Sequence, residues 1–257
     1  MSWLKAGLQI AAVTAFNISL TNPNPSESTR KSLKTSDFKK PRFDDLIIRA
    51  LVPLSNVGAP SPIYFLRRLT LDEHDLCKLA IILPVIAETL IAVALSFPSS
   101  PYTPKILALL GHNPLTSTPT PSPLYTAGAV LTVLGSIARV HCFRVLGKHF
   151  TFNIGILKDH ALVTSGPYSY VRHPSYACMI LQIASLVLMH AAPDSGADAC
   201  KAVRVAVALL WGFSASCLLK LAVERPPVED EFLHKEFGKE WEEYSRRVKY
   251  RLIPGVY

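Results

Sequence analysis

The grouping of apolar residues is the feature that most limits how this 257-residue chain can fold. Apolar side chains make up 49% of the sequence, and they gather into blocks separated by proline-rich or charged stretches. A helix of about 20 apolar residues matches the thickness of a bilayer core. We expect membrane helices over residues 3–20, 76–97, 124–140, 176–189 and 202–223. The sequence therefore predicts an all-α, polytopic integral membrane protein with about five transmembrane helices.

The N-terminal part of the sequence predicts a helix and a linker that are separate from the membrane domain. Residues 3–20 are interpreted as a short membrane helix, with a signal anchor as the alternative, because the small-residue cleavage pattern of a signal peptide is poor. Residues 21–42 are rich in Pro, Ser, Thr and Lys and bury too little apolar surface to fold alone. We therefore divide the chain into an N-terminal helix with a flexible polar linker, 1–75, and a membrane domain, 76–257, whose motif region is 148–257.

Charge and cysteine usage narrow the possible partners. The formal charge of +8 suits contact with anionic lipid headgroups. Nucleic acid is not an expected partner, because no basic patch interleaved with aromatic residues and no binding motif occurs. The five cysteines are scattered without a CxxC pair, which argues against a disulfide framework and against a zinc site. No metal site is predicted.

Residues 160–176, which read HALVTSGPYSYVRHPSY, combine turn residues, aromatic residues and cations directly before an apolar block. Gly166-Pro167 predicts a turn, and Pro174 is typical of the first turn of a helix. Such a segment predicts a loop at the membrane surface that holds a small polar ligand. Interfacial tyrosine and arginine residues at a plain helix start explain the same composition.

A second polar cluster, ERPPVEDE, follows the last apolar block. Arg225 is expected at the hydrocarbon boundary, where it can pair with the carboxylate of an amphiphilic substrate. Glu229 can accept hydrogen bonds from a ligand. After this cluster, apolar residues recur at helical spacing and predict an amphipathic C-terminal helix: Phe232, Leu233, Phe237, Trp241 and Tyr244. Four cations at the end of the third block are expected to snorkel to the interface: Arg139, His141, Arg144 and Lys148.

Three motifs, LVTSGPYSYVRHPSY, ERPPVEDEFL and FGKEWEEYSRRV, resemble the isoprenylcysteine carboxyl methyltransferase family of integral membrane enzymes. The resemblance covers about the C-terminal 110 residues. It implies S-adenosylmethionine-dependent methylation of the C-terminal carboxylate of prenylated cysteine at the endoplasmic reticulum membrane. The implied partners are prenylated, CaaX-processed proteins or small prenylcysteines, together with membrane lipid. It also implies a cofactor pocket on the cytosolic face, which we expect the C-terminal amphipathic helix to cap.

The resemblance also assigns residues. By position, the family's cofactor contacts fall on His160, Ala161, Leu162, Val163, Tyr168, His173, Pro174, Ser175, Tyr176 and Glu229. Arg225 matches the arginine that contacts the substrate. The chain departs from the family pattern at Cys178, where glycine is common, at Asp230, the second acid of Glu-Glu, at Trp241, where tyrosine is common, and at Val248-Lys249 in place of Val-Pro.

The ionisation of the acceptor separates the candidate reactions. A carboxylate with a pKa near ~4 is already ionised at neutral pH and needs no general base. Methylation of a lipid amine such as that of phosphatidylethanolamine, the second candidate, requires a base to remove a proton from the ammonium. A sterol-type reductase is a third candidate, and a non-catalytic membrane scaffold that keeps the loop for packing is a fourth.

Overall fold

The computed structural model describes residues 2–20, 86–87, 89–110, 120–150, 160–192 and 201–257, and all regular secondary structure within these ranges is helical. The all-α class predicted from the sequence is therefore confirmed for the described residues. The first half of the second predicted span, residues 76–85, lies outside them, and so does most of the predicted linker.

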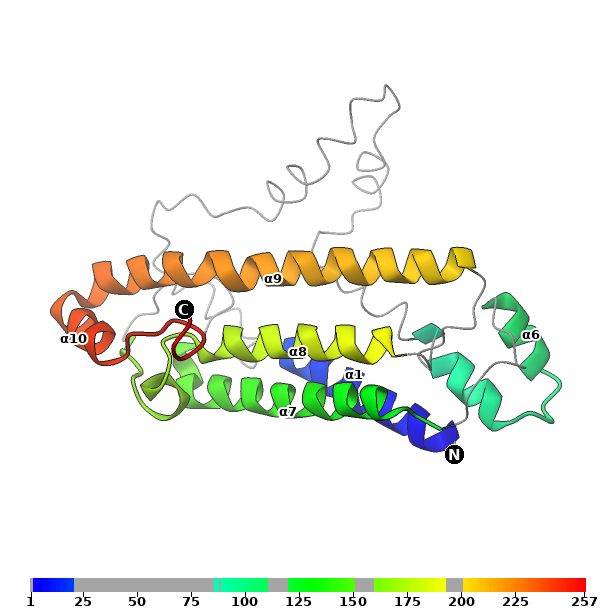
Figure 1. Ribbon diagram of the computed structural model, residues 1–257. Helices are drawn as coiled ribbons and strands as arrows, with labels where there is room; N and C mark the ends of the chain where they lie inside the picture. The colour runs from blue at the N-terminus through cyan, green and yellow to red at the C-terminus, as the bar shows by residue number, and fades with distance from the viewer. Residues whose placement is uncertain (1, 21–85, 88, 111–119, 151–159, 193–200) are drawn as a thin grey trace, which may run out of the picture.

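Three helices form the centre of the molecule: α1 (Ser2–Leu20), α7 (Pro123–Leu146) and α8 (Pro174–Ala191). Figure 1 shows α8 running antiparallel to α7, while α1 runs along α7 in the same direction. Local sequence fixes both ends of α7. The Ser122 side chain accepts a hydrogen bond from the Tyr125 amide at 3.1 Å, and Gly147 ends the helix at a φ of +54°.

Helix α9 (Lys201–Phe237) packs on α8 and extends past the end of the apolar block at residue 223 (Figure 1). It passes through Pro226 and Pro227 without a break, although proline removes a helix hydrogen bond. The amphipathic C-terminal segment predicted as one helix is divided in two at Gly238, whose φ is +53°. Phe232 and Phe237 therefore lie in the last turns of α9, which ends at Phe237, whereas Trp241 lies on α10 (Lys239–Arg247).

Helices α7 and α8 approach each other closely at two glycines of α7. A Cβ atom at Gly128 would lie 2.8 Å from the Met189 Cβ, the Met189 amide nitrogen and the Ser185 carbonyl oxygen. A Cβ at Gly135 would lie 3.0 Å from the Gln182 side chain. Small residues let membrane helices pack backbone to backbone. This close approach holds α8 in register against α7.

Polar side chains join α1 to the other two helices inside this contact. The Tyr125 hydroxyl donates to Gln9 Oε1 at 2.7 Å. The Gln182 amide nitrogen donates to the Ser19 hydroxyl at 2.8 Å and to the Ser136 hydroxyl at 2.7 Å. Interhelical hydrogen bonds of this kind contribute about 0.6 kcal/mol each in membrane proteins. They fix the position of α1 along the α7–α8 pair more than they add to stability.

Two helices among the described residues are long and apolar enough to cross a membrane, Pro123–His149 and Pro174–Ala191. Both correspond to spans predicted from the sequence. The short helix α6 (Thr103–Leu109) packs with residues 91–95 near the opposite end of the bundle from α10 (Figure 1).

Replacing Gly128 by alanine is predicted to destabilise the bundle by about 1–3 kcal/mol, because backbone atoms of α8 must move away from the new methyl group. The measurement is the thermal unfolding midpoint in detergent micelles. Gly7→Ala on α1 is the matched control, since no described atom lies within 4 Å of the place its new methyl group would take. Equal midpoints for the two variants would contradict the close approach.

Candidate active site

The polar residues predicted to carry function meet at one end of the bundle, where α8 begins and α9 approaches α10 (Figure 1). Gly166, with a φ of +60°, opens the short 3-10 helix η3 (Gly166–Ser169), and Pro174 starts α8. The C-terminal segment lies beside this loop. The Arg172 amide donates to the Tyr250 carbonyl at 3.0 Å, and the His173 amide donates to the Arg251 carbonyl at 2.8 Å.

Asp230 on α9 is the centre of an ionic cluster. Its carboxylate accepts from Arg172 Nη2 at 3.1 Å, from His173 Nε2 at 2.8 Å and from Arg251 Nε at 2.8 Å. The Asp230 side chain is only 5% exposed. A carboxylate this buried is tolerated because charged donors satisfy both of its oxygens. It therefore ties the loop before α8 and the C-terminal segment to α9.

Glu229 forms a second group of contacts beside the first. Its carboxylate lies 3.4 Å from His173 Nδ1, accepts from the Tyr176 hydroxyl at 2.5 Å and lies 3.9 Å from Arg225 Nε. The Arg225 and Glu229 side chains are 18% and 25% exposed. His173 thus bridges the two adjacent carboxylates, while the Arg225 and Glu229 side chains stay partly exposed.

The cluster shifts the pKa of each member toward its charged form. Burial alone would lower the pKa of His173, but its hydrogen bonds to Asp230 and Glu229 outweigh burial and raise the pKa. Burial alone would raise the pKa of Glu229 and of Asp230, but hydrogen bonding to His173 and the nearby positive charges lower both. An imidazolium between two carboxylates is therefore the favoured state of the site.

The remaining predicted cofactor contacts lie around this cluster. His160 lies against His149, with ring centroids 4.9 Å apart, and against Phe237 at 5.9 Å. Burial, followed by the charge of His149, lowers the pKa of His160 to about 4, so its ring is neutral at pH 7. Three further residues of this segment are partly or largely exposed: Ala161, Leu162 and Val163. Pro174 is buried at the start of α8, beside the half-buried Ser175.

Four buried polar atoms in this region have no hydrogen-bond partner among the described residues: His160 Nδ1, the Tyr168 hydroxyl, Arg172 Nε and Trp241 Nε1. Buried polar groups are normally satisfied, so orphaned ones indicate a missing partner. Tyr168 is held in place through its carbonyl, which accepts from the Tyr244 hydroxyl at 2.8 Å. Trp241 lies under the Arg172 guanidinium, 5.8 Å from ring centroid to carbon, and 5.1 Å from the His234 ring. These atoms fit a polar ligand with donors and acceptors of its own.

Two features of the site differ from the sequence-based expectation. Arg139, expected to snorkel to the interface, is only 5% exposed, because it donates to carbonyls of α1 and α8 inside the bundle. The three remaining cations of that group are exposed as expected: His141, Arg144 and Lys148. The sequence predicts no part in the site for Arg251, since this residue lies in a segment without a recognised motif.

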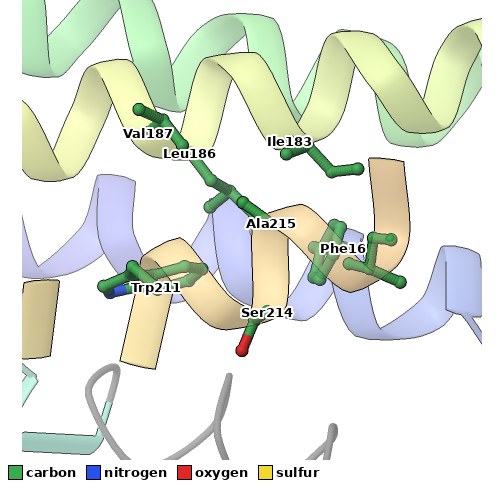
Figure 2. Close-up of a pocket in the computed structure, with 8 residues that line it drawn as sticks. Phe16, Ile183, Leu186, Val187, Trp211, Ser214 and Ala215 are labelled. Carbon is green, nitrogen blue, oxygen red and sulfur yellow. The ribbon is translucent and has the colours of Figure 1, made fainter. Parts of the chain in front are cut away.

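The apolar hollow drawn in Figure 2 lies elsewhere, in the middle of the bundle. Phe16 of α1, three side chains of α8 and four of α9 line it, and Ser214 is the one hydroxyl among them. Its lining contains no titratable side chain, so it carries none of the chemistry of the His173 cluster.

The fold and the site together define an all-helical protein with apolar helices that end at a buried ionic cluster beside unsatisfied polar atoms. Residues 128–230 match the sequence profile of the isoprenylcysteine carboxyl methyltransferase family. This stretch runs from the glycine contact on α7 to Asp230 itself. The family resemblance inferred from the motifs is therefore confirmed.

Individual relatives match this chain over stretches of 123 to 140 residues. The chain is 33% identical over 123 residues to protein-S-isoprenylcysteine O-methyltransferase B of Arabidopsis thaliana, covering 47% of this chain and 55% of the relative. It is 29% identical over 138 residues to the protein-S-isoprenylcysteine O-methyltransferase of Dictyostelium discoideum, covering 52% and 51%. It is also 34% identical over 140 residues to the cobalt-zinc-cadmium resistance protein CzcN of Cupriavidus metallidurans, covering 54% of each. The chain thus spans about half the length of these relatives.

Replacing Asp230 by asparagine is predicted to destabilise the protein by about 3 kcal/mol, because the change leaves buried cations without their counter-charge. The measurement is the thermal midpoint, with limited proteolysis after residue 247 as a second readout. Glu242→Gln on α10, whose carboxylate pairs with exposed His234, is the control and is expected to change little. A loss no larger for Asp230→Asn than for this control would contradict the role of the cluster.

The stabilisation by His173 is predicted to depend on pH. Its contribution is fully present below the ordinary histidine pKa of 6.5 and is lost as the pH rises through its raised pKa. The carboxylates contribute above their ordinary pKa values of 4.5 and 3.8, and that contribution is lost as the pH falls through their lowered values. The difference in thermal midpoint between wild type and His173→Gln should therefore be largest between about pH 4.5 and 6.5. If the thermal midpoints of wild type and His173→Gln differ by the same amount at pH 5.5 and at pH 9, the predicted pH dependence is wrong.

Proposed function

We propose that the chain transfers a methyl group from S-adenosylmethionine to the C-terminal carboxylate of a prenylated cysteine, forming a methyl ester. The observation that carries this proposal is the pairing of Arg225 with Glu229, next to His173 and Tyr176, at the polar end of two apolar helices. This arrangement lies within the region that matches the methyltransferase family. It offers a partly exposed guanidinium to the head of an amphiphilic acid.

Arg225 acts on the acceptor by orientation. Its Nε lies 3.9 Å from Glu229 Oε1, which is an ion-pair distance longer than a hydrogen bond, and its side chain is 18% exposed. A guanidinium can hold a substrate carboxylate through paired N–H donors. The carboxylate is ionised at neutral pH, so the site needs alignment and exclusion of water rather than proton removal.

The cofactor would be held by the segment from His160 to Val163, by Tyr168, by the turn from His173 to Tyr176 and by Glu229. The orphaned polar atoms of His160 and Tyr168 support this assignment, since a nucleoside and an amino acid group offer partners for them. Glu229, kept ionised by His173, provides the negative charge that a sulfonium or ammonium group favours. S-adenosylmethionine supplies an activated methyl group when bound.

The electrostatics of the site disfavour the lipid-amine alternative. Deprotonation of an ammonium acceptor needs a base. His173 is held between two carboxylates with its pKa raised, and Glu229 has its pKa lowered, so both are poor bases at neutral pH. This state of the site supports the carboxylate acceptor.

The membrane arrangement belongs to the same proposal. We place the chain in the endoplasmic reticulum membrane with about five spans, adding α1, the segment around residues 76–97 and the first part of α9 to the two apolar helices. Helix α10 covers the site from one side, through Trp241 against Arg172 and Tyr244 against Tyr168. Prenylated proteins or small prenylcysteines would then reach Arg225 from the lipid.

The test is transfer of labelled methyl from S-adenosylmethionine to N-acetyl farnesylcysteine in membranes, scored as base-labile methyl ester. Arg225→Ala and Glu229→Ala are each expected to lower kcat/KM on the order of 100-fold, because a charge-assisted hydrogen bond contributes about 1.5–3 kcal/mol. Arg225→Ala should act on the acceptor, whereas Glu229→Ala should also weaken cofactor binding.

The matched control is the ion pair one turn earlier on the same helix, Lys220 with Glu224, whose side chains are 43% and 50% exposed. Glu224→Ala is expected to keep nearly full activity. Cofactor binding without ester formation by wild type would redirect the search to another acceptor. If wild type binds no cofactor at all, the proposal that the chain is an enzyme is refuted, and the non-catalytic scaffold remains.

A further inference from the structure

Arg139 is the most unusual charge in the bundle. It lies on α7, is 5% exposed, and donates from Nε to the Ser19 carbonyl at 3.1 Å and from Nη1 to the Ser175 carbonyl at 2.6 Å. Its guanidinium also lies over the Phe143 ring, 5.1 Å from the centroid. A single side chain of α7 is therefore hydrogen-bonded to the last turn of α1 and to the first turn of α8.

The charge of Arg139 has no ionic partner among the described residues, where its acceptors are neutral carbonyl groups. A buried cation is costly unless hydrogen bonds and a favourable ring replace its hydration. Loss of either carbonyl contact would leave that cost uncompensated. The two helix ends are therefore held where Arg139 needs them.

The position of Ser175 fixes the next residue, Tyr176, and through it the proposed substrate site. The Tyr176 hydroxyl donates to Glu229, which pairs in turn with Arg225 and His173. The same turn includes Pro174 and Ser175 of the proposed cofactor contacts. A shift of the Ser175 carbonyl would move Pro174, Ser175 and Tyr176 together, because all three lie in the first turn of α8.

The contact also includes α1, which lies outside the 128–230 family match. Ser19 is held twice, by Arg139 through its carbonyl and by Gln182 through its hydroxyl. The Gln182 contact joins α1 to α8 more deeply in the bundle and does not touch Ser175. At Ser19, α1 is thus held by two polar contacts, and the one from Arg139 also reaches the first turn of α8.

We propose that Arg139 is a positioning residue for methyl transfer, which couples the end of α1 to the first turn of α8 and so aligns the cofactor turn with the Glu229–Arg225 pair. This inference rests on the proposed function. In this proposal, α1 helps to position the first turn of α8 through its contact with Arg139.

The experiment compares Arg139→Met and Arg139→Lys with Gln182→Met. The last is the matched control, because it removes the hydrogen bond from Gln182 to Ser19. Ser19 and Ser136 keep hydrogen bonds to the Phe16 and Thr132 carbonyls in that control. All variants are full-length and reconstituted in lipid nanodiscs, and results are normalised to folded protein. The readouts are the dissociation constant of S-adenosylhomocysteine, the kcat and KM for N-acetyl farnesylcysteine, and hydrogen exchange of the amides of residues 173–178.

Arg139→Met is expected to weaken S-adenosylhomocysteine binding at least about tenfold and to speed exchange at 173–178, since a charged hydrogen bond is lost. Arg139→Lys keeps the positive charge but replaces the planar guanidinium by a compact ammonium group. It should therefore recover part of the cofactor-product affinity and part of the protection from exchange. Gln182→Met should lower the thermal midpoint while leaving affinity within about twofold, because it removes neutral hydrogen bonds away from the site.

Affinity and exchange in Arg139→Met that match those of Gln182→Met would overturn the positioning role and leave Arg139 a structural clamp. If Arg139→Met does not fold, the comparison of Arg139→Lys with Gln182→Met decides in the same way. A wild type that forms no ester refutes the proposed function but not the coupling, which hydrogen exchange at 173–178 tests without ligand.

Discussion

The buried carboxylate of Asp230 is the contact on which the polar end of the molecule depends. It gathers a histidine and two arginines from two separate segments onto one helix. Without it, the loop before α8 and the C-terminal segment would bring cations together with nothing to balance them. Because Glu229 is its neighbour in sequence, the same turn of α9 presents a second carboxylate toward Tyr176 and Arg225. One turn of helix therefore carries both the buried acid and the partly exposed one.

The two adjacent acids have different tasks because their surroundings differ. The Asp230 side chain is 5% exposed and surrounded by donors of the protein, whereas the Glu229 side chain remains a quarter exposed. His173 contacts both, and its hydrogen bonds and positive charge lower the pKa of each carboxyl group. The short side chain of Asp230 is satisfied because donors from Arg172, His173 and Arg251 all reach it.

The sequence is informative wherever local pattern decides the outcome. The apolar blocks at 124–140 and 176–189 predict α7 and α8 to within a few residues at most ends, and the motifs bring His173, Tyr176 and Glu229 into one site. Burial of Arg139 and the role of Arg251 could not be predicted, because both depend on carbonyls and carboxylates contributed by distant segments. The passage of α9 through Pro226 and Pro227 has the same cause, since tertiary packing buries Pro226 and holds the helix together.

The pairing of Arg172 and His173 with Tyr250 and Arg251 joins positions more than 70 residues apart. Contacts of long sequence separation are slow to form, because the chain entropy of closing a long loop opposes them. A ribosome delivers residues in order, so the loop that opens α8 emerges well before the C-terminal segment that completes it. During synthesis, the apolar helices can enter the lipid while the ionic end of the bundle is still open. The ionic cluster therefore closes only once residues 250 and 251 have been synthesised and reach the loop before α8.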